Sequence, residues 1–280
     1  MKKIGVVGSG QMGSGIAQAF IGCGFNTMMV DSSTEALENG LNTINKSLKK
    51  FVAKEKISES DYSAAMSRLT TSISVEELHD CDLVIEAVPE TFEIKQSVFS
   101  LLDTLIKPGA ILATNTSSIP ITQIAAVTKR PESVIGMHFM NPVPLMKLVE
   151  VIRALQTSDE TYSKVFEVAK QLGKTPVEVQ DAPGFVSNRV LLPMINEAIF
   201  CLMEGVANEE GIDTVMKLGM NHPMGPLALA DLIGLDTCLS ILEVLHRDIG
   251  DPKYRPCPLL KKMVSAGYLG KKSGRGFYQY

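Results

Sequence analysis

The first candidate for chemistry is a glycine motif close to the amino terminus, Gly-Ser-Gly-Gln-Met-Gly. Gly8 permits a tight turn, Gly10 lets the backbone approach a pyrophosphate, and Gly13 lets a following helix pack closely on the preceding strand. The start of that helix would offer unpaired N–H groups and the positive end of its dipole to the phosphates. The motif, which includes Gln11 and Met12, therefore predicts a dinucleotide site.

A glycine motif alone is weak evidence, so the acid that follows the next strand-like run carries weight. Asp31 closes that run, eighteen residues after Gly13, near the spacing of about 20 expected for a carboxylate that binds the adenine ribose hydroxyls. Its charge would repel a 2′-phosphate, and Ser32 and Ser33 supply no arginine to receive one. NAD is therefore expected rather than NADP. The alternative is a glycine-rich turn that binds nothing.

A second candidate lies in residues 134–152, which are expected to form two strands joined by a proline-bearing loop. If the strands pair as a hairpin centred on Pro144, His138 faces Glu150, and directly opposed residues have Cβ atoms about 5 Å apart. A carboxylate in so apolar a run is seldom left without a partner. Here it would fix the imidazole tautomer and stabilise the protonated ring, as acid–base catalysis requires. A cross-strand ion pair without chemistry remains the alternative.

Polar residues also follow two further strand-like runs. In an open parallel sheet, ligands bind beyond the carboxyl ends of the strands. Glu90 follows residues 83–88, and the stretch Asn-Thr-Ser-Ser at 115–118 follows residues 111–113. Both are expected near the nicotinamide, although a solvated surface position is the alternative for Glu90.

The elements that position these residues alternate along the first 180 residues. Continuous apolar runs separated by helical segments are typical of a parallel sheet that is covered on both faces. The insertion between the second and third runs begins as an amphipathic helix, because its apolar residues recur at intervals of three and four. The strand-like runs are residues 3–7, 27–31, 83–88, 111–115 and 134–138.

The character of the chain changes at the turn-rich residues 181–184. Helical patterns follow, among them 186–204 and 231–246, without another substantial strand run. The expected fold class is α/β: a Rossmann-type NAD-binding domain with a helical insertion at residues 1–182, then an all-α domain at residues 183–280.

Composition narrows the classes of protein further. The chain has 280 residues, of which 45% are hydrophobic and 21% charged, so it is neither disordered nor collagen-like. Its net charge of −4 is opposite in sign to the positive charge typical of a nucleic-acid-binding protein. Five scattered cysteines without a CxxC pair indicate a reducing compartment. No residue cluster has metal-ligand spacing, and no run resembles a membrane span. We expect a cytoplasmic protein without a metal site.

Over essentially its whole length the chain resembles the short-chain 3-hydroxyacyl-CoA dehydrogenases, in particular the bacterial 3-hydroxybutyryl-CoA dehydrogenases of butyrate and butanol metabolism. The glycine motif is shared with many dehydrogenases, whereas several other motifs are specific to the family. The motifs that carry the resemblance are residues 8–13, 115–118, 136–139, 147–150, 182–186 with Asn188-Arg189, 221–226 and 274–278.

The resemblance implies an NAD(H)-dependent interconversion of (S)-3-hydroxybutyryl-CoA and acetoacetyl-CoA. It makes His138 the acid/base and Glu150 its orienting partner. Ser117 and Asn188 would hydrogen-bond the reacting C3 oxygen and the neighbouring thioester. The resemblance places Glu90 and Lys95 at the nicotinamide half of the cofactor, and the other residues expected to bind the cofactor are Asn115, Ser117 and Asn141.

The CoA end of the substrate is expected at the helical insertion. Ser47, Lys50 and Lys54 fall on one face of the predicted helix, and the pattern alone is typical of a solvated basic face. The family holds the CoA nucleotide on this insertion, so the resemblance makes the three residues phosphate contacts. The helical domain, with apolar segments at 190–199 and 227–242, is expected to supply a homodimer interface.

Three other functions fit parts of the pattern. One is a β-hydroxyacid dehydrogenase that acts on free acids with a catalytic lysine. Another is a non-catalytic, crystallin-like NAD-binding relative, which the presence of the acid–base residues disfavours. The third is a CoA-binding module without redox activity, which would not need the glycine motif together with Asp31.

Overall fold

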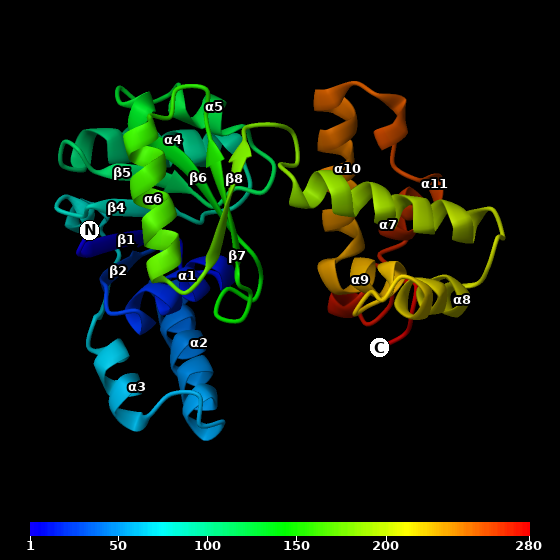
Figure 1. Ribbon diagram of the computed structural model, residues 1–280, viewed down its shortest axis with the longest axis horizontal. Coiled ribbons are helices and arrows are strands. Elements are labelled where there is room, and N and C mark those ends of the chain that lie inside the picture. Colours follow the sequence, from blue (N-terminus) through cyan, green and yellow to red (C-terminus); the bar gives the residue numbers. More distant parts are fainter. The chain divides into compact units, whose positions relative to one another are not determined.

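The computed structural model describes residues 1–280, and the chain divides into two compact units (Figure 1). The first unit, residues 1–181, contains one eight-stranded sheet with helices around it. The second unit, residues 182–280, is helical, and its only β pairing is two isolated bridges near the carboxyl terminus. The α/β fold class with a helical second part is confirmed.

The strands of the sheet lie in the order β3-β2-β1-β4-β5-β6-β7-β8. All pairs from β3 to β6 are parallel, β7 runs antiparallel to β6, and β8 is parallel to β7. The chain crosses over at β1, which lies between β2 and β4, and such a switch point is where an open sheet binds ligands. The strands are β1 (Lys3–Val7), β2 (Asn26–Val30), β3 (Leu69–Ser72), β4 (Leu83–Glu86), β5 (Ile111–Thr114), β6 (Val134–Phe139), β7 (Leu148–Arg153) and β8 (Thr175–Gln180).

Several helices of the first unit pack against this sheet, whereas the two helices between β2 and β3 pack on the first helix and on each other (Figure 1). Ser33, Ser58 and Ser158 begin three of them, each with a hydroxyl that accepts a backbone N–H of the first turn. The predicted insertion helix is present as α2. The helices are α1 (Gln11–Gly22), α2 (Thr34–Ala53), α3 (Glu59–Met66), α4 (Phe92–Leu105), α5 (Ile121–Ala125) and α6 (Asp159–Gln171).

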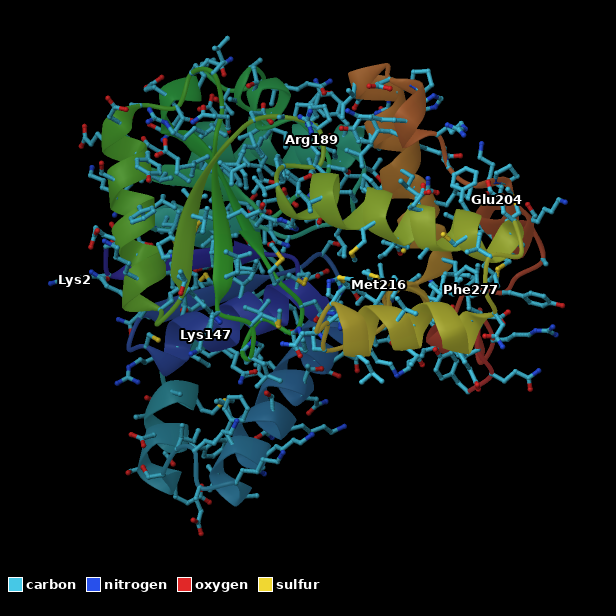
Figure 2. All side chains as sticks on the ribbon, turned by 45° about the vertical axis from the view of Figure 1, so that its right-hand side comes forward. Lys2, Lys147, Arg189, Glu204, Met216 and Phe277 are labelled. Carbon is cyan, nitrogen blue, oxygen red and sulfur yellow. The ribbon has the colours of Figure 1, made fainter.

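The second unit is built around α7 (Ser187–Met203), which the sequence predicts at 186–204; Arg189 and Glu204 are labelled near its two ends (Figure 2). The prediction of one helix over 231–246 is wrong. Gly234, with φ of 104°, ends α9 (Pro226–Ile233) immediately before α10 (Leu235–Ile249). A residue with a side chain rarely adopts this conformation. The remaining helices are α8 (Glu209–Thr214) and α11 (Pro258–Ser265).

The apolar segments expected at a dimer interface have another use in the structure. Most of their large side chains form the core of the helical unit itself, including Leu192, Ile195, Leu235 and Leu242, each at most 1% exposed. Val190 is an exception at 67% exposed. The apolar residues of these segments therefore serve mainly to form the core of the helical unit. No helix of the structure is both long enough and apolar enough to cross a membrane.

Two buried aspartates anchor the carboxyl-terminal segment of this unit. Asp231 accepts hydrogen bonds from the backbone N–H groups of Phe277 (3.0 Å) and Tyr278 (2.9 Å) and from the Tyr280 hydroxyl (3.1 Å). Asp213 accepts one from the Tyr278 hydroxyl at 2.9 Å. Burial, followed by the hydrogen bond to Asp213, raises the pKa of Tyr278. The segment is therefore fixed by charge-assisted hydrogen bonds.

We expect Asp231→Ala to lower the free energy of unfolding of the helical unit by about 2–4 kcal/mol, because two part-buried N–H donors lose their acceptor. Tyr280→Phe, which removes only the hydroxyl, should cost about 1 kcal/mol or less. Urea denaturation followed by circular dichroism measures both. Equal stabilities for the two variants would show that Asp231 does not anchor the segment.

Candidate active site

The glycine motif forms the turn between β1 and α1, and Asp31 lies directly beside it. Ser9 donates to Asp31 Oδ2 from its backbone N–H (2.8 Å) and its hydroxyl (2.9 Å), while Ser33 N–H donates to Oδ1 at 3.1 Å. The Gly8 N–H bonds to the Val30 carbonyl at 2.8 Å. The end of β2 and the glycine turn are thus held together, which places the carboxylate at the position the spacing predicts.

The three glycines of the motif have different reasons to lack a side chain. A Cβ on Gly8 would lie 2.6 Å from the Ala87 carbonyl oxygen, and one on Gly13 would lie 1.8 Å from the Gly8 carbonyl oxygen. A Cβ on Gly10 would meet nothing within 4 Å. Gly8 and Gly13 therefore serve the packing of the protein itself, whereas the space at Gly10 suits the close approach of a phosphate.

The amino terminus of α1 opens onto the same space. Gly10 precedes the helix without a side-chain cap, and the first turn carries no acidic residue. Its N–H groups and the positive end of the helix dipole are thus available to an anion. Met12 packs against the core of the unit, and the Gln11 side chain donates to Asn141 Oδ1 at 3.2 Å. These residues fit a dinucleotide pyrophosphate.

The hairpin of β6 and β7 has the register that the sequence predicts, with His138 opposite Glu150. His138 Nδ1 lies 2.8 Å from Glu150 Oε2, and both residues are at least nine-tenths buried. The other ring nitrogen, Nε2, lies 3.1 Å from Ser117 Oγ. With the carboxylate accepting from Nδ1–H, Nε2 is the nitrogen that faces Ser117 and can exchange a proton there.

Glu90 fixes the loop that carries Ser117. Its Oε1 accepts hydrogen bonds from the Thr116 hydroxyl (2.6 Å), the Ser117 N–H (2.8 Å) and both the N–H and hydroxyl of Ser118 (2.9 and 3.0 Å). Burial tends to raise the pKa of Glu90, but the charge of Lys95 and these hydrogen bonds outweigh it and lower the pKa. Glu90 is therefore ionised, and its carboxylate fixes the conformation of the loop.

The sequence did not predict that Lys95 forms a buried ion pair with Glu86 behind Glu90. The Lys95 ammonium lies 2.6 Å from Glu86 Oε1 and 3.3 Å from Glu90 Oε2, with Glu86 and Lys95 0% and 1% exposed. The Thr114 hydroxyl donates to the other Glu86 oxygen at 2.7 Å. This arrangement gives Lys95 a role in holding Glu90, and its direct contact with a cofactor stays a prediction.

Asn115 and Asn141, also expected to bind the cofactor, lie at the carboxyl ends of β5 and β6. Asn115 Oδ1 accepts the N–H of Phe139, next to His138, at 2.9 Å. Asn141 follows in the loop between β6 and β7. Asn188, by contrast, belongs to the helical unit, where it is the second residue of α7. Its place beside the substrate stays a prediction.

Ser47, Lys50 and Lys54 line one cavity of about 330 Å³ in the first unit. Its walls are α1, the second half of α2 with the residues after it, and the loop at 141–145. The predicted basic face therefore borders a cavity rather than only open solvent, and the cavity reaches the loop that follows His138.

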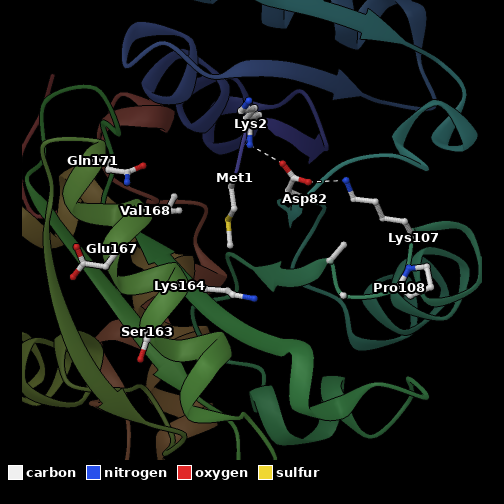
Figure 3. Close-up of a pocket in the computed structure, with 12 residues that line it drawn as sticks. Met1, Lys2, Asp82, Lys107, Pro108, Ser163, Lys164, Glu167, Val168 and Gln171 are labelled. Atoms are coloured by element: carbon white, nitrogen blue, oxygen red, sulfur yellow. Dashed lines mark hydrogen bonds and ion pairs between the residues drawn. The ribbon is translucent and has the colours of Figure 1, made fainter.

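A larger cavity of about 600 Å³ lies at the other edge of the sheet, near the starts of β1, β4 and β5. There Lys2 N–H and Lys107 Nζ both bond to Asp82, each at 2.6 Å (Figure 3). None of the predicted catalytic or cofactor residues lines it. Its size alone does not make it the active site, since ligands of such sheets bind at the carboxyl ends of the strands.

Comparison with known proteins agrees with this geometry. The family model described as the 3-hydroxyacyl-CoA dehydrogenase NAD binding domain matches residues 3–182, and that of the 3-hydroxyacyl-CoA dehydrogenase C-terminal domain matches residues 184–280. The chain belongs to the 3-hydroxyacyl-CoA dehydrogenase family. Its first unit is the NAD-binding domain of that family, so NAD(H) is the cofactor.

Individual relatives match over the whole chain. A probable 3-hydroxybutyryl-CoA dehydrogenase of Bacillus subtilis is 61% identical over 280 residues, covering 100% of this chain and 98% of the relative. The 3-hydroxybutyryl-CoA dehydrogenase of Bradyrhizobium diazoefficiens is 53% identical, with 100% and 96% covered. The crystal structure of (S)-3-hydroxybutyryl-CoA dehydrogenase PaaH1 from Ralstonia eutropha superimposes with a TM-score of 0.98 at 52% identity, covering 100% and 99% of the two chains. The family resemblance predicted from the motifs is confirmed.

Proposed function

We propose that this dehydrogenase interconverts (S)-3-hydroxybutyryl-CoA and acetoacetyl-CoA, in fatty acid and butyrate–butanol metabolism. The observation that carries the proposal is the buried imidazole of His138, held by Glu150 on one nitrogen and facing Ser117 with the other. This group lies at the carboxyl ends of the parallel strands, where the open space at Gly10 also lies. The names of the relatives supply the substrate.

In the oxidation direction, His138 Nε2 takes the proton of the C3 hydroxyl. Bound NAD would supply the acceptor for the hydride that leaves C3. The positive charge that develops on the imidazole is offset by Glu150, 2.8 Å from Nδ1. Ser117 would hydrogen-bond the C3 oxygen and Asn188 the neighbouring thioester. Reduction reverses each step.

The cofactor would bind at the carboxyl ends of the parallel strands. The N–H groups at the start of α1 would bind the pyrophosphate through Gly10, Gln11 and Met12, and Asp31 would bind the adenine ribose and disfavour a 2′-phosphate. The proposed contacts of the nicotinamide half are Glu90, Lys95, Asn115, Ser117 and Asn141. Lys50 and Lys54, with Ser47, would bind phosphates of CoA.

Oxidation of matched substrates tests the proposal. We expect NAD-dependent turnover with (S)-3-hydroxybutyryl-CoA and far less with the (R) ester, with free 3-hydroxybutyrate or with NADP. Turnover of the free acid at a similar rate would instead support the β-hydroxyacid dehydrogenase alternative. NADH binding without turnover of any substrate would support the crystallin-like alternative.

The same proposal includes a homodimer formed through the helical unit. Three large apolar side chains lie close together in the sequence after α8 and are exposed: Val215 (61%), Leu218 (83%) and Met220 (61%). Contiguous exposed apolar patches mark interfaces, and we propose that these three residues belong to one. We place the enzyme in the cytoplasm, a location supported by its five free cysteines.

We expect Leu218→Glu to shift the dimer toward monomer, because a charge would have to be buried in an apolar interface. Light scattering after size-exclusion chromatography measures the mass. Lys217→Glu, at an exposed polar neighbour, is the control for charge alone. A wild-type monomer, or a Leu218→Glu dimer as stable as the wild type, would contradict this placement of the interface.

A further inference from the structure

Gln18 is a mostly buried residue whose amide atoms are open to a cavity and form no hydrogen bond within the protein. It lies in the second half of α1 and is 5% exposed, and its side chain neither donates nor accepts a hydrogen bond within the chain. Buried side-chain amides are normally paired. Asn196, also buried, shows the usual situation, because it donates to the Arg255 carbonyl (3.0 Å) and accepts from the Cys257 N–H (2.8 Å).

The Gln18 side chain lines the cavity that contains the basic face of α2. Gln11, Ser14, Gly15 and Gln18 all line this cavity from α1, and their spacing of three, one and three residues places them on one face of the helix. The Ser14 hydroxyl is already bonded to the Gly10 carbonyl at 2.8 Å. The Gln18 amide is therefore the unused donor and acceptor on this wall.

The cavity extends from Lys50 and Lys54 to the loop that follows His138. One wall is the loop at 141–145, which begins two residues after Phe139 and so close to His138. Lys50 and Lys54 line the same cavity. A CoA thioester with its acyl carbon at His138 and its phosphates at these lysines would have its pantetheine arm between them. That arm carries two secondary amides.

We propose that Gln18 hydrogen-bonds an amide of the pantetheine arm and so contributes to recognition of the thioester. A primary amide can donate to a carbonyl and accept from an N–H, which is the complement of a secondary amide. The neighbouring Phe51, Pro144 and Leu145 offer apolar surface to the methyl and methylene groups of the arm. The inference rests on the proposed function, since it assumes a CoA substrate.

Gln18→Met tests it, because methionine has a similar length and no amide. The variant breaks no hydrogen bond within the protein, so we expect its melting temperature to equal or exceed that of the wild type. We expect kcat/KM to fall about tenfold, the loss of about one hydrogen bond. The fall should appear in KM, equally for acetoacetyl-CoA and acetoacetyl-pantetheine, with NADH affinity unchanged.

Lys54→Met is the matched control. Acetoacetyl-pantetheine lacks the nucleotide phosphates, so this variant should lose activity on acetoacetyl-CoA only. Gln18→Leu serves as a second variant if Gln18→Met folds poorly. An unchanged KM, a loss confined to acetoacetyl-CoA, or a weakened NADH affinity would each overturn the role of Gln18. Absence of wild-type turnover with either thioester would instead refute the proposed function.

Discussion

Replacing His138 by glutamine is expected to lower kcat for acetoacetyl-CoA reduction by about 10²–10⁴-fold, the usual contribution of a positioned acid or base. Glutamine retains hydrogen-bonding groups but cannot deliver a proton to the C3 oxygen. The ring lies between Glu150 and Ser117, neither of which belongs to the glycine turn. NADH affinity should therefore be unchanged when it is measured by fluorescence titration.

Glu150→Gln is the matched variant for this experiment. It keeps the size of the side chain but removes the charge that stabilises the protonated imidazole, 2.8 Å away. We expect its kcat to fall as well, and the double variant to lose less than the product of the two single losses, because the two groups act as a unit. Near-normal turnover by His138→Gln would remove His138 from the mechanism.

The second large effect concerns two glycines three residues apart. Gly13→Ala would place a methyl group 1.8 Å from the Gly8 carbonyl oxygen, so α1 must move away from the turn. We expect a marked loss of stability, on the order of 2–4 kcal/mol, together with loss of NADH binding. Thermal melting and fluorescence titration measure the two effects.

Gly10→Ala should separate these two effects. A methyl group there meets nothing within 4 Å, and the backbone, with φ of −65°, accommodates alanine. Stability should stay within about 0.5 kcal/mol of the wild type, whereas NADH affinity should fall at least tenfold, since the methyl group would occupy the approach of the pyrophosphate. Unchanged NADH affinity in Gly10→Ala would move the phosphates elsewhere.

Local patterns in the sequence were sufficient to predict the hairpin of His138 and Glu150 and the glycine turn. Strand pairing in a short hairpin fixes the opposite residue once the turn is located, which is why the register of His138 and Glu150 could be obtained from Pro144. The distance from Gly13 to Asp31 is set in the same way by one helix and one strand.

Features that depend on tertiary packing were not predictable from local patterns. A lysine on a helix such as α4 is typically solvated, yet Glu86 and Glu90 hold Lys95 in the interior. β3 has a mostly polar sequence, and β8 is an edge strand with most of its residues exposed. Their pairing is specified by neighbouring strands more than by their own residues.

The most direct test of the central claim is to measure the consumption of NADH with acetoacetyl-CoA from the absorbance of NADH. Two parallel reactions replace acetoacetyl-CoA by free acetoacetate, or NADH by NADPH. Rapid oxidation of one NADH per acetoacetyl-CoA, with little activity on the free acid or with NADPH, is the predicted result. It would support the roles proposed for Asp31, His138 and the basic face of α2. Tight NADH binding without turnover of acetoacetyl-CoA would contradict it.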